Sequence, residues 1–101
     1  MKRFVYRVLD LEEWLNFKKK KVFIGNDLDQ RSGYIHLSQK DQLRKTIDIY
    51  FKKKKIVILK IRTKNLKQKL LWEVSRAGEK FPHLYDKLTL ENVVKADYPD
   101  V

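Results

Sequence analysis

The sequence predicts an α+β fold in a single domain that spans residues 1–101. The chain length matches that of one small domain. Segments with strand and helix patterns alternate over the first half of the chain, whereas strand patterns in the second half follow one another with short connections. This change favours mixed or antiparallel strands around a cleft, with two main helices, over a doubly wound parallel sheet.

The N-terminal part predicts a strand followed by a helix. Residues 3–8 (RFVYRV) are rich in the β-branched and aromatic side chains that are typical of strands. Asp10 and Glu13 have the spacing of a capping box, which predicts a helix that begins at residue 11. Residues 18–21 are four lysines at the expected C-terminal end, where cations interact favourably with the helix dipole. Residues 26–32 (NDLDQRS) are expected to form a polar loop.

A second strand and helix are expected next. Residues 33–38 (GYIHLS) have the pattern of a strand, and Ser38 with Asp41 predicts an N-cap for a helix over residues 39–51. The lysine run at 52–55 then lies at the end of that helix, as the first run does. Both runs are therefore interpreted first as solvated helix ends.

The second half is dominated by strands. Residues 55–62 (KIVILKIR) contain the strongest strand pattern, and the apolar run predicts a central strand buried on both faces. Shorter segments complete the domain: a turn over 64–69 capped by Thr63, a strand at 70–74 (LLWEV), a helical turn capped by Thr89, and a last strand near 93–98.

Composition narrows the classes of function. There are no cysteines, which excludes disulfides, thiolate catalysis and cysteine-ligated zinc. The two histidines lack HxH or HxxxH spacing, and no glycine-rich phosphate loop is present, so no metal site or P-loop is predicted. The longest apolar run has four residues, and Asp10 interrupts any signal-type segment, which predicts a cytoplasmic protein without a membrane span.

The net charge of +11 would attract polyanions. Much of the excess lies in the two lysine runs, which contain neither arginine nor aromatic residues for base contacts. Nonspecific binding of nucleic acid, or of an acidic protein, through these runs is kept as an alternative function.

GYIHLS is the first candidate site. Strand alternation places Tyr34, His36 and Ser38 on one face and Ile35 and Leu37 on the other, which the core should occupy. The polar row can bind a polar ligand. The competing interpretation is an ordinary histidine on a half-exposed sheet face.

A second candidate lies in the last third of the chain. FPHLY (81–85) predicts a rigid loop that presents His83, with Tyr85 beside it, although the same loop would equally pin the chain to the core. Glu73 of the WE pair would act as an acceptor or base if it shares a cleft with a histidine. An exposed structural glutamate is the simpler interpretation.

Together GYIHLS, LLWEV and FPHLYDKLTLENVV, with the opening FVYRVLDLEEW, resemble the bacterial domain of unknown function 952 family over essentially the whole chain. The resemblance implies a small fold similar to ADP-ribosyltransferases, which bind NAD in a cleft between two small sheets. His36 matches the histidine of the family's GFIH motif, Ser38 the hydroxyl residue after it, and Glu73 the acid of the WE pair. His83 and Tyr85 match the FPH motif and the aromatic residue that follows. Arg7 departs from the family, which usually has a histidine there, and arginine is not a plausible base.

The resemblance and the residue patterns lead to one prediction. A cleft lined by Arg7, Tyr34, His36, Ser38, Glu73 and His83 binds NAD, ADP-ribose or a related nucleotide. Arg7 meets the phosphates, His36 and Ser38 hold a ribose, and Tyr34 or Tyr85 stacks on a base. Glu73 and His36 are the candidate catalytic residues for ADP-ribosyl transfer. The sequence leaves open whether the protein is an enzyme and which oligomeric state it adopts.

Overall fold

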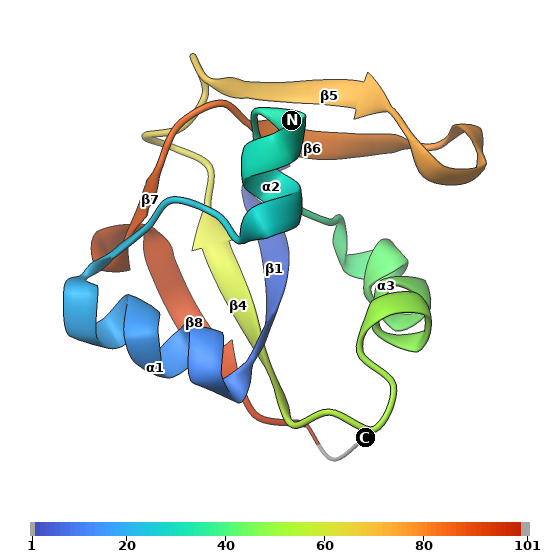
Figure 1. Ribbon diagram of the computed structural model, residues 1–101. Helices are drawn as coiled ribbons and strands as arrows, with labels where there is room; N and C mark the ends of the chain where they lie inside the picture. Colours follow the sequence, from blue (N-terminus) through green and yellow to red (C-terminus); the bar gives the residue numbers. More distant parts are fainter. Residues whose placement is uncertain (1, 100–101) are drawn as a thin grey trace.

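Three small antiparallel sheets and three α-helices appear in the computed structural model, which describes residues 2–99 (Figure 1). Residues 1, 100 and 101 of the predicted domain lie outside the described residues. The strands are β1 (Phe4–Asp10), β2 (Val22–Phe23), β3 (Ile35–His36), β4 (Ile56–Arg62), β5 (Leu70–Val74), β6 (Lys80–Leu84), β7 (Leu88–Thr89) and β8 (Val93–Asp97). The helices are α1 (Leu11–Lys20), α2 (Asp27–Ser32) and α3 (Leu43–Tyr50), with 3₁₀ turns η1 (Lys40–Gln42), η2 (Arg76–Gly78) and η3 (Leu90–Asn92). The α+β class is confirmed.

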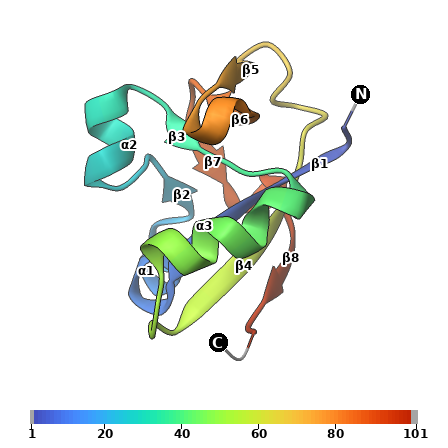
Figure 2. The ribbon, with the colours of Figure 1, turned by 90° about the vertical axis from the view of Figure 1, so that its right-hand side faces the viewer.

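The strand β4 is the centre of the largest apolar cluster. It lies between β1 and β8 in one sheet, and Val57, Leu59 and Ile61 on one of its faces have no exposed surface. This face packs against α1 through Trp14 and Phe17. The alternate residues of β4 point to the opposite face, where they meet the apolar side of α3, which covers β1 and β4 in Figure 2. The predicted burial on both faces is confirmed.

The second three-stranded sheet, in the order β3-β6-β5, crosses above the first in Figure 1. Within residues 2–99 one isolated bridge joins the two sheets, where Tyr6 and Ser38 exchange two backbone hydrogen bonds of 2.8 Å. Ile35 and Leu37 are buried in the core as predicted, so His36 faces the opposite side of the sheet.

Helix α1 forms as predicted from its caps. The Asp10 side chain accepts from the backbone of Glu13 at 2.8 Å, and the Glu13 carboxylate accepts from the backbone of Asp10 at 3.0 Å. The lysine run follows, and Lys21 adopts a left-handed conformation with φ of 65° at the C-cap. None of the helices within residues 2–99 combines the length and apolar character needed to cross a membrane.

Two expected local structures were wrong. NDLDQRS is a helix, α2, rather than a loop, because Asn26 and Asp29 form a capping box that starts it. FPHLY is not a loop either, since residues 80–84 form β6 in the middle of its sheet. Pro82 is tolerated there because its carbonyl accepts from Leu37 beyond the end of β3, while the lost N–H lies on that same side.

Two predicted caps also differ. Ser38 does not cap the following helix: its backbone is paired with Tyr6, and its hydroxyl lies 3.4 Å from that of Thr46. The Gln42 side chain accepts from the Gln39 backbone at the start of η1, and α3 begins only at Leu43. The Thr63 hydroxyl bonds to the carbonyls of Lys2 and Arg3 instead of capping the next turn. In both cases a partner distant in sequence replaced the local one.

Truncation of Leu59 tests the role of β4. Leu59→Ala removes a side chain with no exposed surface from the core, and we expect it to lower the free energy of unfolding by about 2–5 kcal/mol in urea denaturation. Leu15→Ala on helix α1 is the matched control, because Leu15 is 52% exposed and its loss should cost less than about 0.5 kcal/mol. Equal losses in the two variants would contradict this description of the core.

Candidate functional site

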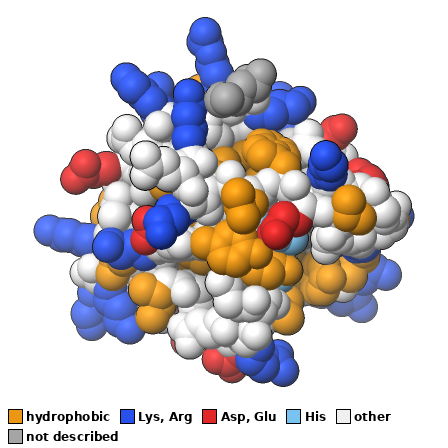
Figure 3. Space-filling model, turned by 90° about the horizontal axis from the view of Figure 1, so that it is seen from above, with side chains coloured by type: hydrophobic (Ala, Val, Ile, Leu, Met, Phe, Trp, Pro, Cys, Tyr) orange, Lys and Arg blue, Asp and Glu red, His pale blue; other side chains and the backbone are white. Residues whose placement is uncertain are grey.

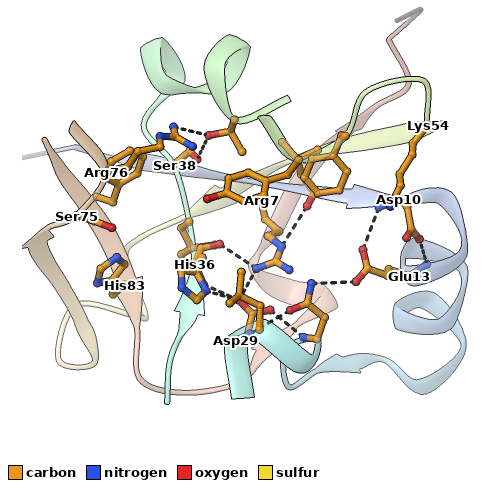
Figure 4. A pocket seen from close by; sticks show the side chains of 18 residues that line it. Arg7, Asp10, Glu13, Asp29, His36, Ser38, Lys54, Ser75, Arg76 and His83 are labelled. Carbon is orange, nitrogen blue, oxygen red and sulfur yellow. Dashed lines mark hydrogen bonds and ion pairs between the residues drawn. The ribbon is translucent and has the colours of Figure 1, made fainter. Parts of the chain in front are cut away.

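An open cavity of about 420 Å³ lies between the two three-stranded sheets, and residues of helices α2 and α3 contribute to its lining (Figure 4). This volume lies in the range of small-molecule sites. In Figure 4 Arg7 and Asp29 lie in the middle of the cavity wall. One end carries Asp10, Glu13 and Lys54, and the other carries Ser38, Ser75, Arg76 and His83.

Four of the predicted site residues line this cavity: Arg7, His36, Ser38 and His83. The other three, Tyr34, Glu73 and Tyr85, are not among the lining residues. The expectation that Tyr34 and Glu73 form part of the cleft wall is therefore wrong. They lie behind the wall and contact the histidines that form it.

Asp29 is the hub of the site. It is 2% exposed, and its Oδ1 accepts from Arg7 Nη1 at 2.9 Å, from the His36 backbone N–H at 3.0 Å and from His36 Nδ1 at 2.7 Å. Its Oδ2 accepts from the Asn26 backbone at 2.8 Å. Burial raises the pKa of Asp29, but the hydrogen bonds from His36 and Arg7 and the charge of Arg7 outweigh it, so this pKa lies well below its usual value.

Gly25 makes room for this carboxylate. Its φ is 101°, and a Cβ built on it would lie 2.6 Å from the Cβ of Asp29. A side chain at this position would therefore strain the backbone and displace Asp29 together.

Arg7 is buried, and most of its donors are used inside the protein. Its Nη1 also donates to the His36 carbonyl at 3.0 Å, its Nε donates to the Val8 carbonyl at 3.2 Å, and its guanidinium lies over the Phe23 ring at 5.0 Å. The Nη2 atom has no partner among the described residues. Since no fully buried side-chain nitrogen or oxygen in residues 2–99 lacks a partner, Nη2 must reach solvent through the cavity that Arg7 lines.

His83 is held by a second carboxylate. The Oε1 atom of Glu73 lies 2.8 Å from His83 Nδ1 and accepts from the Tyr85 hydroxyl at 2.7 Å. The hydrogen bonds from Tyr85 and His83 lower the pKa of Glu73, and the same bond to Glu73 raises the pKa of Tyr85. Glu73 therefore stays ionised and orients His83.

An aromatic cluster that does not line the cavity packs against the two histidines. The Tyr34 ring stacks on His83 with centroids 4.0 Å apart, and lies 4.7 Å from His36 and 5.2 Å from Tyr85. Seen from above, the surface of the molecule has apolar side chains gathered around a carboxylate and a histidine (Figure 3). Tyr34 thus packs against both imidazoles and limits their rotation.

Several residues of the site were missed in the sequence. Asp29 had a usable signal, since Asn26 and Asp29 have capping-box spacing. Arg76, which donates to Thr46 at 3.1 Å, had none, because it comes from an irregular turn. No group of three or more His, Asp or Glu side chains in residues 2–99 is arranged to hold a metal ion.

Two of the comparisons with known proteins found matches, one to a family and one to solved structures. The family described as "Protein of unknown function (DUF952)" matches residues 8–96. The crystal structure of protein CC0527 from Caulobacter crescentus is 33% identical with a TM-score of 0.91, covering 97% of this chain and 87% of that one. The solution NMR structure of CC0527 is also 33% identical, with a TM-score of 0.85 and coverage of 97% and 85%. The comparison with curated proteins found no match.

Removal of the Asp29 charge should destabilise the fold strongly. Asp29→Asn leaves the buried Arg7 guanidinium without its counter-ion, and we expect a loss of about 3–5 kcal/mol in the free energy of unfolding. Asp48→Asn, at an exposed position of helix α3, is the control and should change stability by less than about 0.5 kcal/mol. A loss below about 1 kcal/mol for Asp29→Asn would show that Asp29 is not the hub.

The same charge predicts a pH dependence. Because the pKa of Asp29 is lower in the folded state than its ordinary value of 3.8, its stabilisation is complete above that value and is lost as the pH falls through the folded-state pKa. Urea denaturation from pH 7 to pH 2 gives the free energy of unfolding of the unsubstituted protein and of Asp29→Asn. The difference between the two should shrink only below about pH 4. A difference that grows on acidification would have the wrong sign.

Proposed function

The chain belongs to the DUF952 family, and we propose that its cavity binds a nucleotide of the NAD or ADP-ribose type. One observation carries the proposal: three cationic side chains, Arg7, Lys54 and Arg76, line the same cavity as hydroxyl and carboxylate groups. The cations can bind phosphates, and ribose hydroxyls can donate to the hydroxyl and carboxylate groups. The placement of the cavity between two small sheets supports the ADP-ribosyltransferase-like fold that the sequence resemblance implies.

The cations differ in how available they are. Arg7 keeps Nη2 for a ligand, while its other nitrogens are bound within the protein. Arg76 is half-buried over the Phe81 ring at 5.0 Å, with Nη2 bonded to Thr46. Lys54 is exposed at the far end of the cavity. Arg7 and Arg76 are therefore proposed to meet the phosphates, as Arg7 was predicted to do.

The proposed roles of other residues shift with the geometry. His36 and Ser38 line the cavity and keep their proposed place beside a ribose. Tyr34 and Tyr85 do not line it, whereas Tyr50 and Phe51 do, so the stacking role passes to these two rings. Glu73 is bonded to His83 and Tyr85 and does not line the cavity, so this geometry does not support its predicted part as a catalytic residue of ADP-ribosyl transfer.

The alternative function, polyanion binding through the lysine runs, is weakened by their separation. The backbone of Leu11, the first residue of α1, bonds to the carbonyl of Lys55, so the second run ends where α1 begins. The first run lies at the other end of this ten-residue helix, about 15 Å away. This exceeds the screening length of about 8 Å at physiological salt, so the two runs add little to each other's electrostatic field, which argues against one continuous patch.

Thermal unfolding tests nucleotide binding. NAD or ADP-ribose at about 100 times its Kd should stabilise the protein by about 2.7 kcal/mol, which raises Tm by roughly 10 °C or more. We expect the shift to persist at high salt and to be lost in Arg76→Ala, because the phosphate loses a cation. Lys19→Ala, on the exposed end of α1, should keep it.

Two results would overturn the nucleotide proposal. One is the absence of any shift with either nucleotide. The other is a shift with a short RNA alone that disappears as salt rises, which would favour the lysine runs.

A further inference from the structure

The two histidines of the chain form a facing pair. His36 on β3 and His83 on β6 are direct partners in the antiparallel register, and their ring centroids are 5.8 Å apart at 66°. Both line the cavity. Strand pairing therefore fixes the spacing of two imidazoles that open into one space.

Each imidazole is oriented in the same way by a carboxylate. Nδ1 of His36 lies 2.7 Å from Asp29, and Nδ1 of His83 lies 2.8 Å from Glu73. With Nδ1 held in this way, Nε2 is the nitrogen left to act on a ligand. Neutral histidine then offers an Nε2 lone pair that takes a proton, and imidazolium offers an Nε2–H that donates one.

The Nε2 atom of His83 must be open to the cavity. His83 is only 3% exposed, and its Nε2 has no hydrogen-bond partner among residues 2–99. Because every fully buried side-chain nitrogen or oxygen in that range has a partner, this Nε2 is reachable by solvent. Tyr34 stacks on the ring and does not line the cavity, whereas His83 does, so we infer that access to this Nε2 comes from the cavity.

Two imidazole nitrogens beside cationic side chains suit acid–base catalysis of a displacement at phosphorus. Displacement at phosphorus needs a base for the entering oxygen and an acid for the leaving oxygen, on opposite sides of the phosphorus atom. The charge that develops on the other phosphoryl oxygens needs cations, which Arg7 Nη2 and Arg76 can supply. The hydroxyl of Ser38 is paired with that of Thr46 at 3.4 Å rather than with a histidine, and the scheme takes water as the nucleophile.

We propose that His36 and His83 act as a general acid–base pair that hydrolyses nucleoside 2′,3′-cyclic phosphates in this cavity. The water oxygen bonds to phosphorus while one Nε2 removes its proton. The bond from phosphorus to one ribose oxygen breaks, and the other Nε2 donates its proton to that oxygen. One water is consumed and a nucleoside 2′- or 3′-monophosphate is formed. The inference rests on the proposed function only in that the cavity accepts a nucleoside phosphate.

The test is hydrolysis of the four nucleoside 2′,3′-cyclic monophosphates by the full chain, followed by ³¹P NMR or chromatography of the monophosphate. We expect turnover by the unsubstituted protein and a fall in kcat of about 100-fold or more in His36→Gln and in His83→Gln. Lys19→Ala is the control and should retain full activity. Folding of each variant is checked by its thermal transition.

Glu73→Gln separates catalysis from a structural role. Glu73 is a positioning residue in this scheme, because it touches His83 and not the cavity. Its substitution should lower kcat by about 10-fold and leave KM unchanged. Free imidazole should also restore part of the activity of His83→Ala, which a merely structural histidine would not allow.

The outcomes distinguish this inference from the proposed function. The inference is overturned if the unsubstituted protein hydrolyses none of the four substrates. It is also overturned if both His→Gln variants fold and keep an activity within about threefold of that of the unsubstituted protein. If NAD or ADP-ribose still raises Tm in that case, nucleotide binding is supported and only the hydrolysis is rejected. Hydrolysis without stabilisation by NAD or ADP-ribose overturns the proposed ligand and supports the histidine pair.

Discussion

The buried ion pair between Arg7 and Asp29 organises the rest of the structure. Strand alternation puts Arg7 on the same face of β1 as Val5 and Leu9, which have no exposed surface, so its charge enters the core side of the sheet. A lone charge there would cost several kcal/mol. Asp29 cancels it and also holds both the backbone and the ring of His36. One carboxylate thereby ties β1, α2 and β3 together around the cavity.

Such a pair is a poor way to obtain stability alone. Well-packed apolar side chains of similar volume often match or exceed a buried ion pair in stability. What they could not do is leave the Nη2 of Arg7 open to the cavity or set the orientation of His36. The pair also gives arginine a role at a position where the sequence resemblance implies a histidine: Arg7 contributes charge and position to this wall, and neither requires it to act as a base.

The sequence predicted the features that local patterns control. Alternation in GYIHLS correctly separated the core residues Ile35 and Leu37 from His36, and the apolar run of β4 correctly marked a central strand. Helix α2 was missed because it has six residues and too few apolar positions to show a helical period. Asp29 could not be assigned to Arg7 in advance, since 22 positions separate them and only the folded chain brings them together.

The contact between Glu73 and His83 also forms only in the folded chain. Together with the contact between Asp29 and His36, it leaves one ring nitrogen of each histidine without a side-chain partner. A histidine that serves only to pin two strands would be expected to use both nitrogens once buried, because an unsatisfied polar atom away from water costs about 1–3 kcal/mol. In both histidines here only Nδ1 has a side-chain partner within residues 2–99. The remaining nitrogen is tolerated because the cavity reaches it. The cavity and the free Nε2 atoms therefore depend on each other. Filling the space with apolar side chains would leave the buried His83 nitrogen unsatisfied, and removing the carboxylates would remove the hydrogen bonds that orient both rings.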